Sequence, residues 1–401
     1  MPAKKKPQRR ETIAANKDVL RWARNVRGLS VAEAAKQLEI SEIELAEVES
    51  GKLQPRTKTF DKMVGVYKQP ESVLLLAHPP ATDPLPQDFR TVGGKRAHLT
   101  PETLLAIREA RDLQYYVSEL VADDPQLISR SGLPSIDLSN SPENAAILER
   151  QRLSLPLAVQ LSWSPRESFE RWRDFLERRG LLVVLKKMFW NDCRGFSLLD
   201  SNLLPTIVVN SHDAPAARIF TLFHEYAHLL VRNAGICQAT AVSSSTEQWC
   251  NSFAGAFLIP ANDLQEQLQD LQIPAGPRYN WPLTSITRLA RHYRVSRPVI
   301  AIRLQGLKLA PQTFYQTHKT ELHKLDQPPE PKEPPKIIRK PGYKERQTLK
   351  EVGITAASII LRAWKERTAD AMEAADALNL NVDELYGFQE QAELQRVRYV
   401  G

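Results

Sequence analysis

Two histidines four residues apart, with a glutamate directly after the first, lie in an apolar run whose spacing is typical of a helix. The residues are His224, Glu225 and His228, within the run from Phe220 to Leu230. Side chains four apart on a helix share one face, roughly 5–6 Å apart, so both imidazoles can reach one ion. Glu225 is offset by one residue, which places it to take a proton from an attacking water. The pattern alone fits a metal-dependent hydrolase, and it also fits chance recurrence of a short motif.

A second apolar helical run, over residues 246–259, supplies a third ligand. Glu247 lies at its start, and two histidines with one glutamate form a standard ligand set for a catalytic zinc ion with one open position. Asn251 lies one turn later on the same face, where it can hold a ligand histidine in one tautomer. We therefore predict Zn2+ as the cofactor, with three protein ligands: His224, His228 and Glu247.

Composition restricts the class of protein. The chain has 401 residues, 42% of them hydrophobic, which is room for about two to four domains with buried cores. No run reaches the roughly 18 apolar residues of a membrane span, so we expect a cytoplasmic protein without membrane contact. The three cysteines fit neither a disulfide framework nor a cysteine-based zinc site and are expected to be reduced: Cys193, Cys237 and Cys250.

Short apolar helical patterns follow one another near the amino terminus. A first helix is predicted from Asp18 and ends at Gly28, residues 31–38 form a second helix capped by Ser30, and a third helix starts after Ser41. The run over residues 40–55 resembles the helix-turn-helix of repressors of the Xre (Cro/C1) type. The resemblance implies a five-helix domain of the kind that binds DNA.

The reading surface of this domain is unusual for a DNA-binding protein. Glu42, Glu44 and Glu47 occupy the helix that normally offers basic or amide side chains to the bases. Carboxylates there repel the phosphates, which lie about 1.7 Å apart along the duplex axis. Lys52 is a candidate contact to DNA or to a partner. Direct DNA reading and a protein-docking or vestigial module both stay open.

The apolar pattern changes to short runs typical of strands just before the histidines. The predicted strands cover residues 181–185, 194–199 and 206–210. A small sheet before the histidine helix suits metallopeptidases, in which an edge strand can pair with an extended peptide substrate. Upstream we predict an irregular segment over 70–100 and helices over 101–130 and 141–179.

Several motifs around the metal ligands together resemble the ImmA/IrrE family of bacterial metallopeptidases. They are Arg194-Gly195-Phe196, residues 207–211, residues 217–222, the His224 to His228 motif, and Glu247-x-x-x-Asn251-x-Phe253-Ala254. The resemblance spans about residues 165 to 310 and implies a zinc-dependent regulatory endopeptidase that acts on repressor proteins, in phage-immunity, stress or toxin–antitoxin settings. It implies zinc ligation by His224, His228 and Glu247, and a general-base role for Glu225.

Some positions depart from the family pattern. Tyr226 and Ala227 replace an apolar residue and glycine between the histidines, and both fit a helix. Cys250 replaces an alanine; a thiol facing the ion would fill its open position, whereas a buried unreactive cysteine is the ordinary case. His212 and Tyr226 are candidates to stabilise an oxyanion, and packing or surface roles are the alternative.

A second helix pair, over residues 284–308, has basic exposed positions. The resembled family has a helix-turn-helix-like segment here that often serves structure. Contact with DNA or a partner and a solvated basic face are therefore both open. The candidate contact residues are Arg288, Arg291, Arg294 and Arg297.

Prolines among charges after residue 326 predict an extended linker. The module that follows contains one apolar helix through Trp364, a second helix capped by Thr368, and a third that begins over residues 382–385. Such tails resemble those of larger family members paired with toxins, so we expect partner docking.

These patterns predict a multi-domain, mainly α protein. It combines an N-terminal five-helix-type helix-turn-helix domain, a central α+β zincin-like domain with a small sheet, and a C-terminal helical module. The predicted parts are a basic tail (1–12), the Xre-type domain (13–72), a linker and helical region (73–164), the metallopeptidase domain (165–275), a helix-turn-helix-like segment (276–318), a proline-rich linker (319–343) and the helical module (344–401).

Two functions remain in competition. The first is a zinc endopeptidase that cleaves or controls a protein partner, a repressor or a cognate toxin. The second is a DNA-binding regulator or antitoxin in which the metallopeptidase fold binds or senses without turnover. An oligomer is compatible with both.

Overall fold

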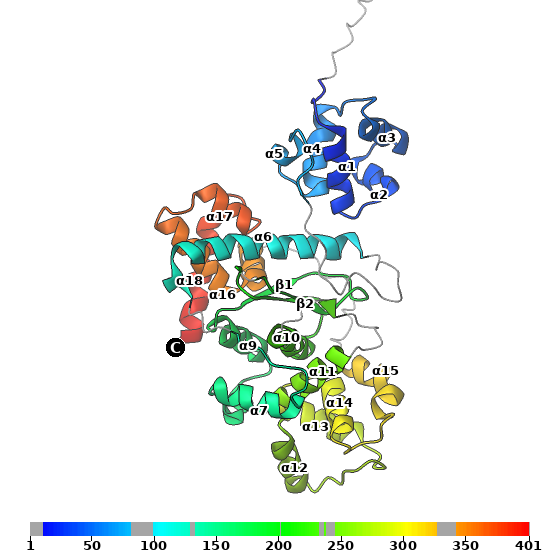
Figure 1. The fold of residues 1–401 in the computed structure, drawn as a ribbon, viewed down its shortest axis with the longest axis vertical. Coiled ribbons are helices and arrows are strands. Elements are labelled where there is room, and N and C mark those ends of the chain that lie inside the picture. The colour runs from blue at the N-terminus through cyan, green and yellow to red at the C-terminus, as the bar shows by residue number, and fades with distance from the viewer. Residues whose placement is uncertain are drawn as a thin grey trace, which may run out of the picture. The chain divides into compact units, whose positions relative to one another are not determined.

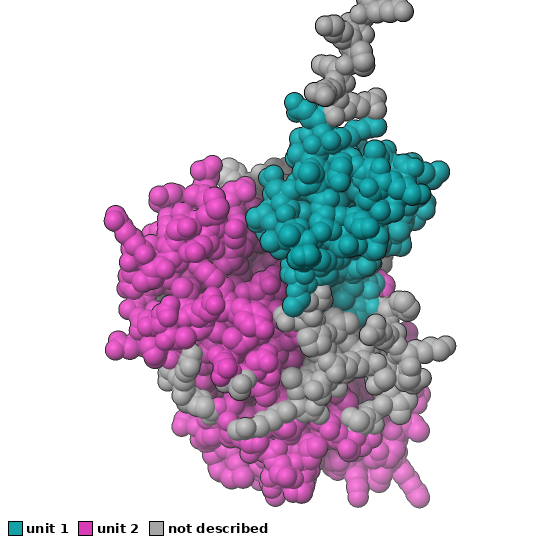
Figure 2. All heavy atoms as spheres, turned by 45° about the horizontal axis from the view of Figure 1, so that its top comes forward, with its two compact units in different colours: residues 1–85, 98–107 teal, residues 86–97, 108–401 magenta. Residues whose placement is uncertain are grey.

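The computed structural model describes residues 11–81, 99–128, 133–200, 202–231, 236–237, 245–326 and 342–400. The chain forms two compact units, one of residues 1–85 with 98–107 and one of 86–97 with 108–401 (Figure 2). Residues 1–10 of the predicted basic tail (1–12) and residues 327–341 of the predicted linker (319–343) lie outside the described residues. Among the described helices, none is long and apolar enough to cross a membrane.

The first unit is a helical bundle around one apolar core. Its elements are α1 (Lys17–Val26), α2 (Val31–Leu38), α3 (Glu42–Ser50), α4 (Thr57–Tyr67) and α5 (Glu71–Leu74). Leu38 and Leu45 are buried in this core, and Arg24 forms a largely buried ion pair with Glu49. α2 has the predicted bounds. The resemblance implied a fifth helix, but the sequence patterns assigned the segment of α5 as irregular; Pro70 directly precedes this single helical turn.

Local hydrogen bonds fix the turn between α2 and α3. Ser30 and Glu33 cap α2 reciprocally, each side chain accepting from the other residue's amide. Glu39 ends α2 in the left-handed region with φ 58°, and the amide of Ile40 donates back into the last turn of α2. Ser41 then caps α3.

A four-stranded mixed sheet lies in the second unit, with strand order β1-β3-β2-β4. Its strands are β1 (Leu182–Lys186), β2 (Gly195–Leu198), β3 (Thr206–Asn210) and β4 (Ile236–Cys237). β1 runs parallel to β3, and β2 runs antiparallel to β3 and to β4. The first three strands confirm the predicted ones. β4 was missed because two residues are too few to show a periodic pattern.

Beyond the first bundle, helices account for most of the chain. They are α6 (Pro101–Asp123), α7 (Pro142–Arg152), α8 (Leu157–Ser162), α9 (Ser168–Glu177), α10 (Pro215–Leu230), α11 (Ser245–Leu258), α12 (Ala261–Asp270), α13 (Leu283–Tyr293), α14 (Arg297–Gly306), α15 (Phe314–Asp326), α16 (Tyr343–Lys365), α17 (Ala371–Ala377) and α18 (Glu384–Val400). The stretch predicted as helical over 141–179 contains three helices, because Pro156 and Pro165 interrupt it. α15 continues past the predicted start of the linker at 319.

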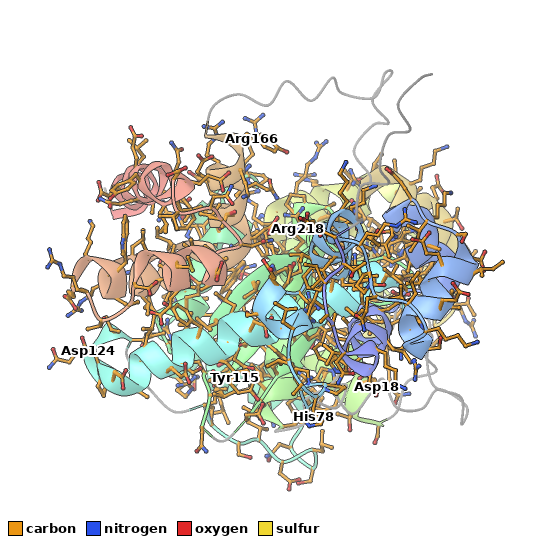
Figure 3. The ribbon with its side chains drawn as sticks, turned by 90° about the horizontal axis from the view of Figure 1, so that it is seen from above. Asp18, His78, Tyr115, Asp124, Arg166 and Arg218 are labelled. Atoms are coloured by element: carbon orange, nitrogen blue, oxygen red, sulfur yellow. The ribbon has the colours of Figure 1, made fainter. Side chains whose placement is uncertain are left out.

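Helices cover both faces of the sheet (Figure 1). α9 and α10 pack on one face and α6 lies along the other, so that every residue of β1, β2 and β3 is buried. Gln114 of α6 donates to the carbonyl of Leu204, just before β3, at 2.8 Å. Tyr115 lies on the exposed side of α6, and Asp124 just beyond its end pairs with Arg362 at 3.2 Å (Figure 3).

One core joins the sheet, α10 and the helices that follow. Phe223 of α10 stacks on Phe257 of α11 with ring centroids 4.4 Å apart, and Trp172 of α9 meets Phe223 edge to face at 4.6 Å. Leu289 of α13 and Ile300 of α14 belong to the same buried cluster. The helix that carries the histidines is therefore held on several sides.

The carboxy-terminal module packs on α9 and β1 at a break in α16. Gly353 interrupts the predicted single helix with φ 83° and ψ 165°, and Arg173 of α9 donates to the carbonyls of Lys350 and Glu351 beside it. A β-carbon at Gly353 would lie 2.5 Å from the Arg173 guanidinium. The close approach therefore requires glycine.

The cap of α17 differs from the prediction. Asp370, not Thr368, is the capping residue, and its side chain accepts from the amides of Met372 and Glu373. The Glu373 side chain accepts from the amide of Asp370 in return. Thr368 instead donates its hydroxyl to the carbonyl of Ala363, one turn back.

Candidate metal centre

The predicted ligands come together between α10 and α11. Pro215 opens α10 at a position where its missing amide proton is not needed. The helix is buried from its middle to its end, since β2, β3, α9 and α11 all pack around it. His224 and His228 lie on the α11 side, and Glu247, in the first turn of α11, faces them.

The spacing of the donor atoms fits a metal ion. The Nε2 atoms of His224 and His228 are 3.0 Å apart, and carboxylate oxygens of Glu247 lie 3.3 and 3.2 Å from them. A tetrahedral ion with bonds of about 2.0–2.1 Å holds its ligand atoms about 3.3 Å apart. The three side chains therefore converge on a volume the size of one ion. Two imidazole nitrogens and one carboxylate suit a cation that binds both nitrogen and oxygen donors, as zinc does.

Electrostatics within the cluster favour a shared proton when no cation is bound. Burial lowers the pKa of His228, but hydrogen bonds with Cys250 and Glu247 outweigh it and raise that pKa to about 11. Burial lowers the pKa of His224. Burial opposes ionisation of Glu247, yet the two imidazoles bring its pKa far below the ordinary value. A cation must displace the proton held by His228.

Two residues of α11 interact with the two histidines. Asn251 forms a side-chain hydrogen bond with His224, and Cys250 forms one with His228. The Cys250 thiol is fully buried, which raises its pKa, and it stands outside the cluster of ligand atoms formed by the described residues.

Gly195 sets the distance between the sheet and Glu225. A β-carbon on this β2 residue would lie 2.6 Å from Thr221, 2.8 Å from the carbonyl of Val208 and 3.3 Å from Cγ of Glu225. Glu225 is fully buried. β2 can approach the carboxylate-bearing side of α10 this closely only without a side chain at this position.

Tyr226 lies between the histidines in sequence but points to α7. Its hydroxyl donates to Glu149 at 2.5 Å, and Arg152 bonds to both groups. Burial and the Glu149 carboxylate raise the pKa of Tyr226 well above its ordinary value. Tyr226 thus anchors α10 to α7, whereas His212, its companion candidate for an oxyanion role, is exposed.

The structure divides the predicted basic contacts into two kinds. Arg288 and Arg291 are exposed on α13. Arg294 donates to the carbonyl of Trp163, and Arg297 pairs with Asp326. α14, the second helix of this pair, is buried over most of its length, so it cannot enter a groove. Lys52 is exposed in the first unit.

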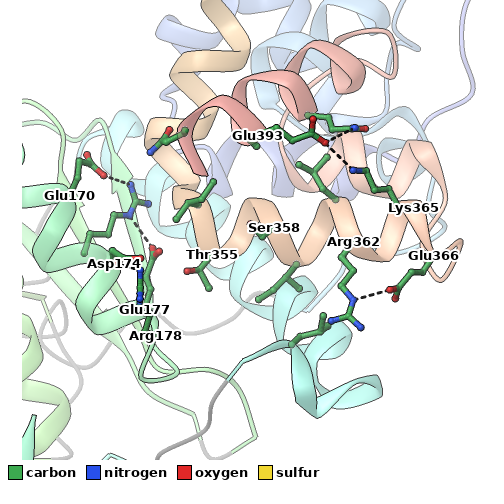
Figure 4. Close-up of a pocket in the computed structure, with 18 residues that line it drawn as sticks. Glu170, Asp174, Glu177, Arg178, Thr355, Ser358, Arg362, Lys365, Glu366 and Glu393 are labelled. Atoms are coloured by element: carbon green, nitrogen blue, oxygen red, sulfur yellow. Dashed lines mark hydrogen bonds and ion pairs between the residues drawn. The ribbon is translucent and has the colours of Figure 1, made fainter. Parts of the chain in front are cut away.

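A separate hollow of about 700 Å3 lies between α9, α16 and α18 (Figure 4). Acidic and basic side chains line it in alternation, and many are already paired with one another. Arg362 pairs with Glu366 and Lys365 with Glu393. None of the metal-binding residues lines it.

Sequence reasoning missed the residues that support the metal ligands. Glu149 and Arg152 lie on a helix far away in sequence, and no local spacing connects them with Tyr226. Gly195 lay inside a recognised motif, and a glycine within a strand does signal a close backbone approach.

The comparisons with known proteins agree with this geometry. Residues 176–305 match the family model of the IrrE N-terminal-like domain, Peptidase_M78. No curated protein matches the chain. The matched segment contains the whole sheet, both helices of the centre and all three clustered side chains. Residues 176–305 therefore form a metallopeptidase domain of the IrrE N-terminal-like family, in which His224, His228 and Glu247 are grouped as a metal site.

Proposed function

We propose that this protein is a zinc-dependent regulatory endopeptidase. The observation that carries the proposal is the convergence of His224, His228 and Glu247 to within 3.0–3.3 Å inside a metallopeptidase domain. When bound, zinc would polarise a peptide carbonyl and lower the pKa of water. The chain's own part is to hold the ligand rings through Asn251 and Cys250 and to accept a proton at the Glu225 carboxylate.

The sheet supports an extended peptide as substrate. β4 forms the edge next to β2, and its Cys237 pairs with Gly195, the residue that approaches Glu225. A peptide that paired with the free edge of β4 would lie one strand further out than Gly195, beside the sheet that packs on the histidine helix. We propose a protein partner, a repressor or similar regulator, as the physiological substrate, in stress, phage or toxin–antitoxin regulation.

The test compares the zinc-loaded chain with its Glu225→Gln variant on unfolded protein and on peptide libraries. We expect equal zinc content and a loss of hydrolysis by roughly 100- to 10,000-fold, as for removal of a general base. Equal hydrolysis by both proteins would remove Glu225 from the mechanism. Failure of both to cleave any peptide, with zinc bound, would favour a binding function.

A second candidate is a DNA-binding regulator or antitoxin. The capped turn between α2 and α3 supports it, because that turn fits a helix-turn-helix of Xre type. The exposed carboxylates of Glu42 and Glu47 oppose it. A mobility shift on the chain's own promoter at physiological salt tests this candidate, and the absence of sequence-specific binding would remove it.

A further inference from the structure

The turn between α17 and α18 repeats the turn between α2 and α3. Asn379 ends α17 in the left-handed region with φ 53°, as Glu39 does with φ 58° after α2. The amide of Leu380 donates to the carbonyl of Ala375 at 2.8 Å, and the amide of Ile40 donates to that of Ala35 at 3.1 Å. The two helix pairs therefore share one turn geometry.

The two sequences stay in register on both sides of this turn. Each pair starts with a reciprocal cap and continues with two buried alanines, a buried leucine before the turn and two buried apolar residues in the second helix. The corresponding buried residues are Ala34, Ala35, Leu38, Leu45 and Val48 in one pair and Ala374, Ala375, Leu378, Leu385 and Phe388 in the other. The carboxy-terminal pair is thus a second helix-turn-helix.

Its outward face differs from that of the first pair. Met372, Val382 and Tyr386 are 66%, 40% and 69% exposed, at the positions that Ala32, Glu42 and Ala46 hold in the amino-terminal pair. In a helix-turn-helix, the start of the first helix and the outward side of the second share the face that meets DNA. Tyr386 also packs edge to face on Trp364 at 5.1 Å. The face of the carboxy-terminal pair that corresponds to a DNA-contacting face is therefore apolar.

The two helices that carry this face are acidic. Residues 371–391 contain five carboxylates and no lysine or arginine, in a chain of net charge +7. Glu384 pairs with Lys344 at 2.6 Å, whereas Asp376, Asp383 and Glu390 are exposed. A face of this charge repels nucleic acid and anionic lipid surfaces.

We propose that Met372, Val382 and Tyr386 form a docking face for a basic protein segment that carries an apolar side chain. Methionine and tyrosine are enriched at the centres of protein interfaces, and a polar rim is the usual surround. The acidic rim would attract a partner of positive charge and orient it. A second copy of this chain fits poorly, because a two-fold contact would bring the same carboxylates together.

The probe for this face is a synthetic amphipathic helix with leucines on one side and lysines on the other. The full chain should bind it, and the matched helix with glutamates in place of lysines should not bind. Tyr386→Ala and the double variant Asp383→Lys, Glu390→Lys should each weaken binding about tenfold or more. Leu148→Ala, which trims an exposed apolar side chain on α7, away from this face, is the control and should leave binding unchanged.

Methyl resonances give a second readout. Of the four methionines, Met63 and Met188 are fully buried and Met1 lies outside the described residues, so the signal that is lost in Met372→Ala should be the one that shifts on addition of the basic helix. Equal binding of both helices, or binding that survives Tyr386→Ala, would overturn the proposal. Self-association or a DNA shift that Tyr386→Ala abolishes would also overturn it, by assigning the face to a second copy or to nucleic acid.

Discussion

The metal centre and the α17–α18 face depart in opposite directions from the rule that apolar residues are inside and polar residues outside. At the metal centre, the exposed fraction is 1% for His228 and 0% for Glu225. At the α17–α18 face, Met372 and Tyr386 are about two-thirds exposed. Buried polar groups are costly unless something satisfies them, whereas exposed apolar groups cost the isolated fold little. Substitutions at the metal centre should therefore impair zinc binding, hydrolysis or stability, whereas substitution of an exposed residue of the α17–α18 face should leave stability nearly unchanged.

The largest effect is expected from Glu247→Ala, which removes one of three ligands. Loss of residues that merely orient ligands weakens metal binding about 10- to 100-fold, so loss of a ligand should exceed that. Zinc content after dialysis against a weak chelator measures it. An unchanged zinc content would mean that the ion binds elsewhere, and Glu266→Ala on α12 is the control carboxylate.

Leu385→Ala should be the most destabilising change at the α17–α18 turn. Leu385 is fully buried, and truncating a buried leucine costs about 2–5 kcal/mol. Chemical denaturation of the full chain measures the effect. A cost below about 1 kcal/mol would show that the α17–α18 pair is loosely packed, which would undermine its comparison with α2–α3.

Gly195→Ala should lower stability by about 1–3 kcal/mol through overpacking. It should also reduce hydrolysis while zinc content is kept, because the new methyl group would displace Glu225 rather than the ligands. Gly255→Ala in α11 is the control, since a β-carbon there would make only an ordinary contact, 3.6 Å from Arg303. Equal behaviour of the two variants would contradict a positioning role for Gly195.

Zinc binding should become about tenfold tighter for each unit of rising pH between about 7 and 10. The pKa of His228 is raised to about 11 in the metal-free protein, so that ring is protonated over this range and must release one proton. The pKa of His224 is lowered, so its ring contributes none. Calorimetry in buffers of different ionisation enthalpy counts the protons released on zinc binding. A count of zero would show that His224 and His228 are both neutral before zinc binds.

The smallest effect is expected from Met372→Ala. Its side chain is 66% exposed, and surface substitutions of this kind change stability by less than about 0.5 kcal/mol. Thermal unfolding measures it. A substantial loss of stability would mean that Met372 supports the fold, and the contrast between the two regions would then fail.

Much of the metal centre could be predicted from the sequence, because its geometry is largely local. The spacing of His224 and His228 is a property of one helix, and the motif around Glu247 places the third ligand in the first turn of another. The predicted strands were found because apolar runs of four or five residues leave a pattern. The seven-part division of the chain and the physiological partner stay predictions.

What the sequence by itself determined is the chemistry: which side chains can bind an ion. Only the tertiary structure decided which charged side chains are available. It paired Arg297 with Asp326 and buried α14, and it turned Tyr226 toward Glu149. It also left Met372 and Tyr386 exposed at the α17–α18 turn, which has the geometry of the α2–α3 turn, where Glu42 is exposed instead. The physical reason is that spacing within one helix is fixed by the backbone, whereas burial depends on which distant elements pack on that helix.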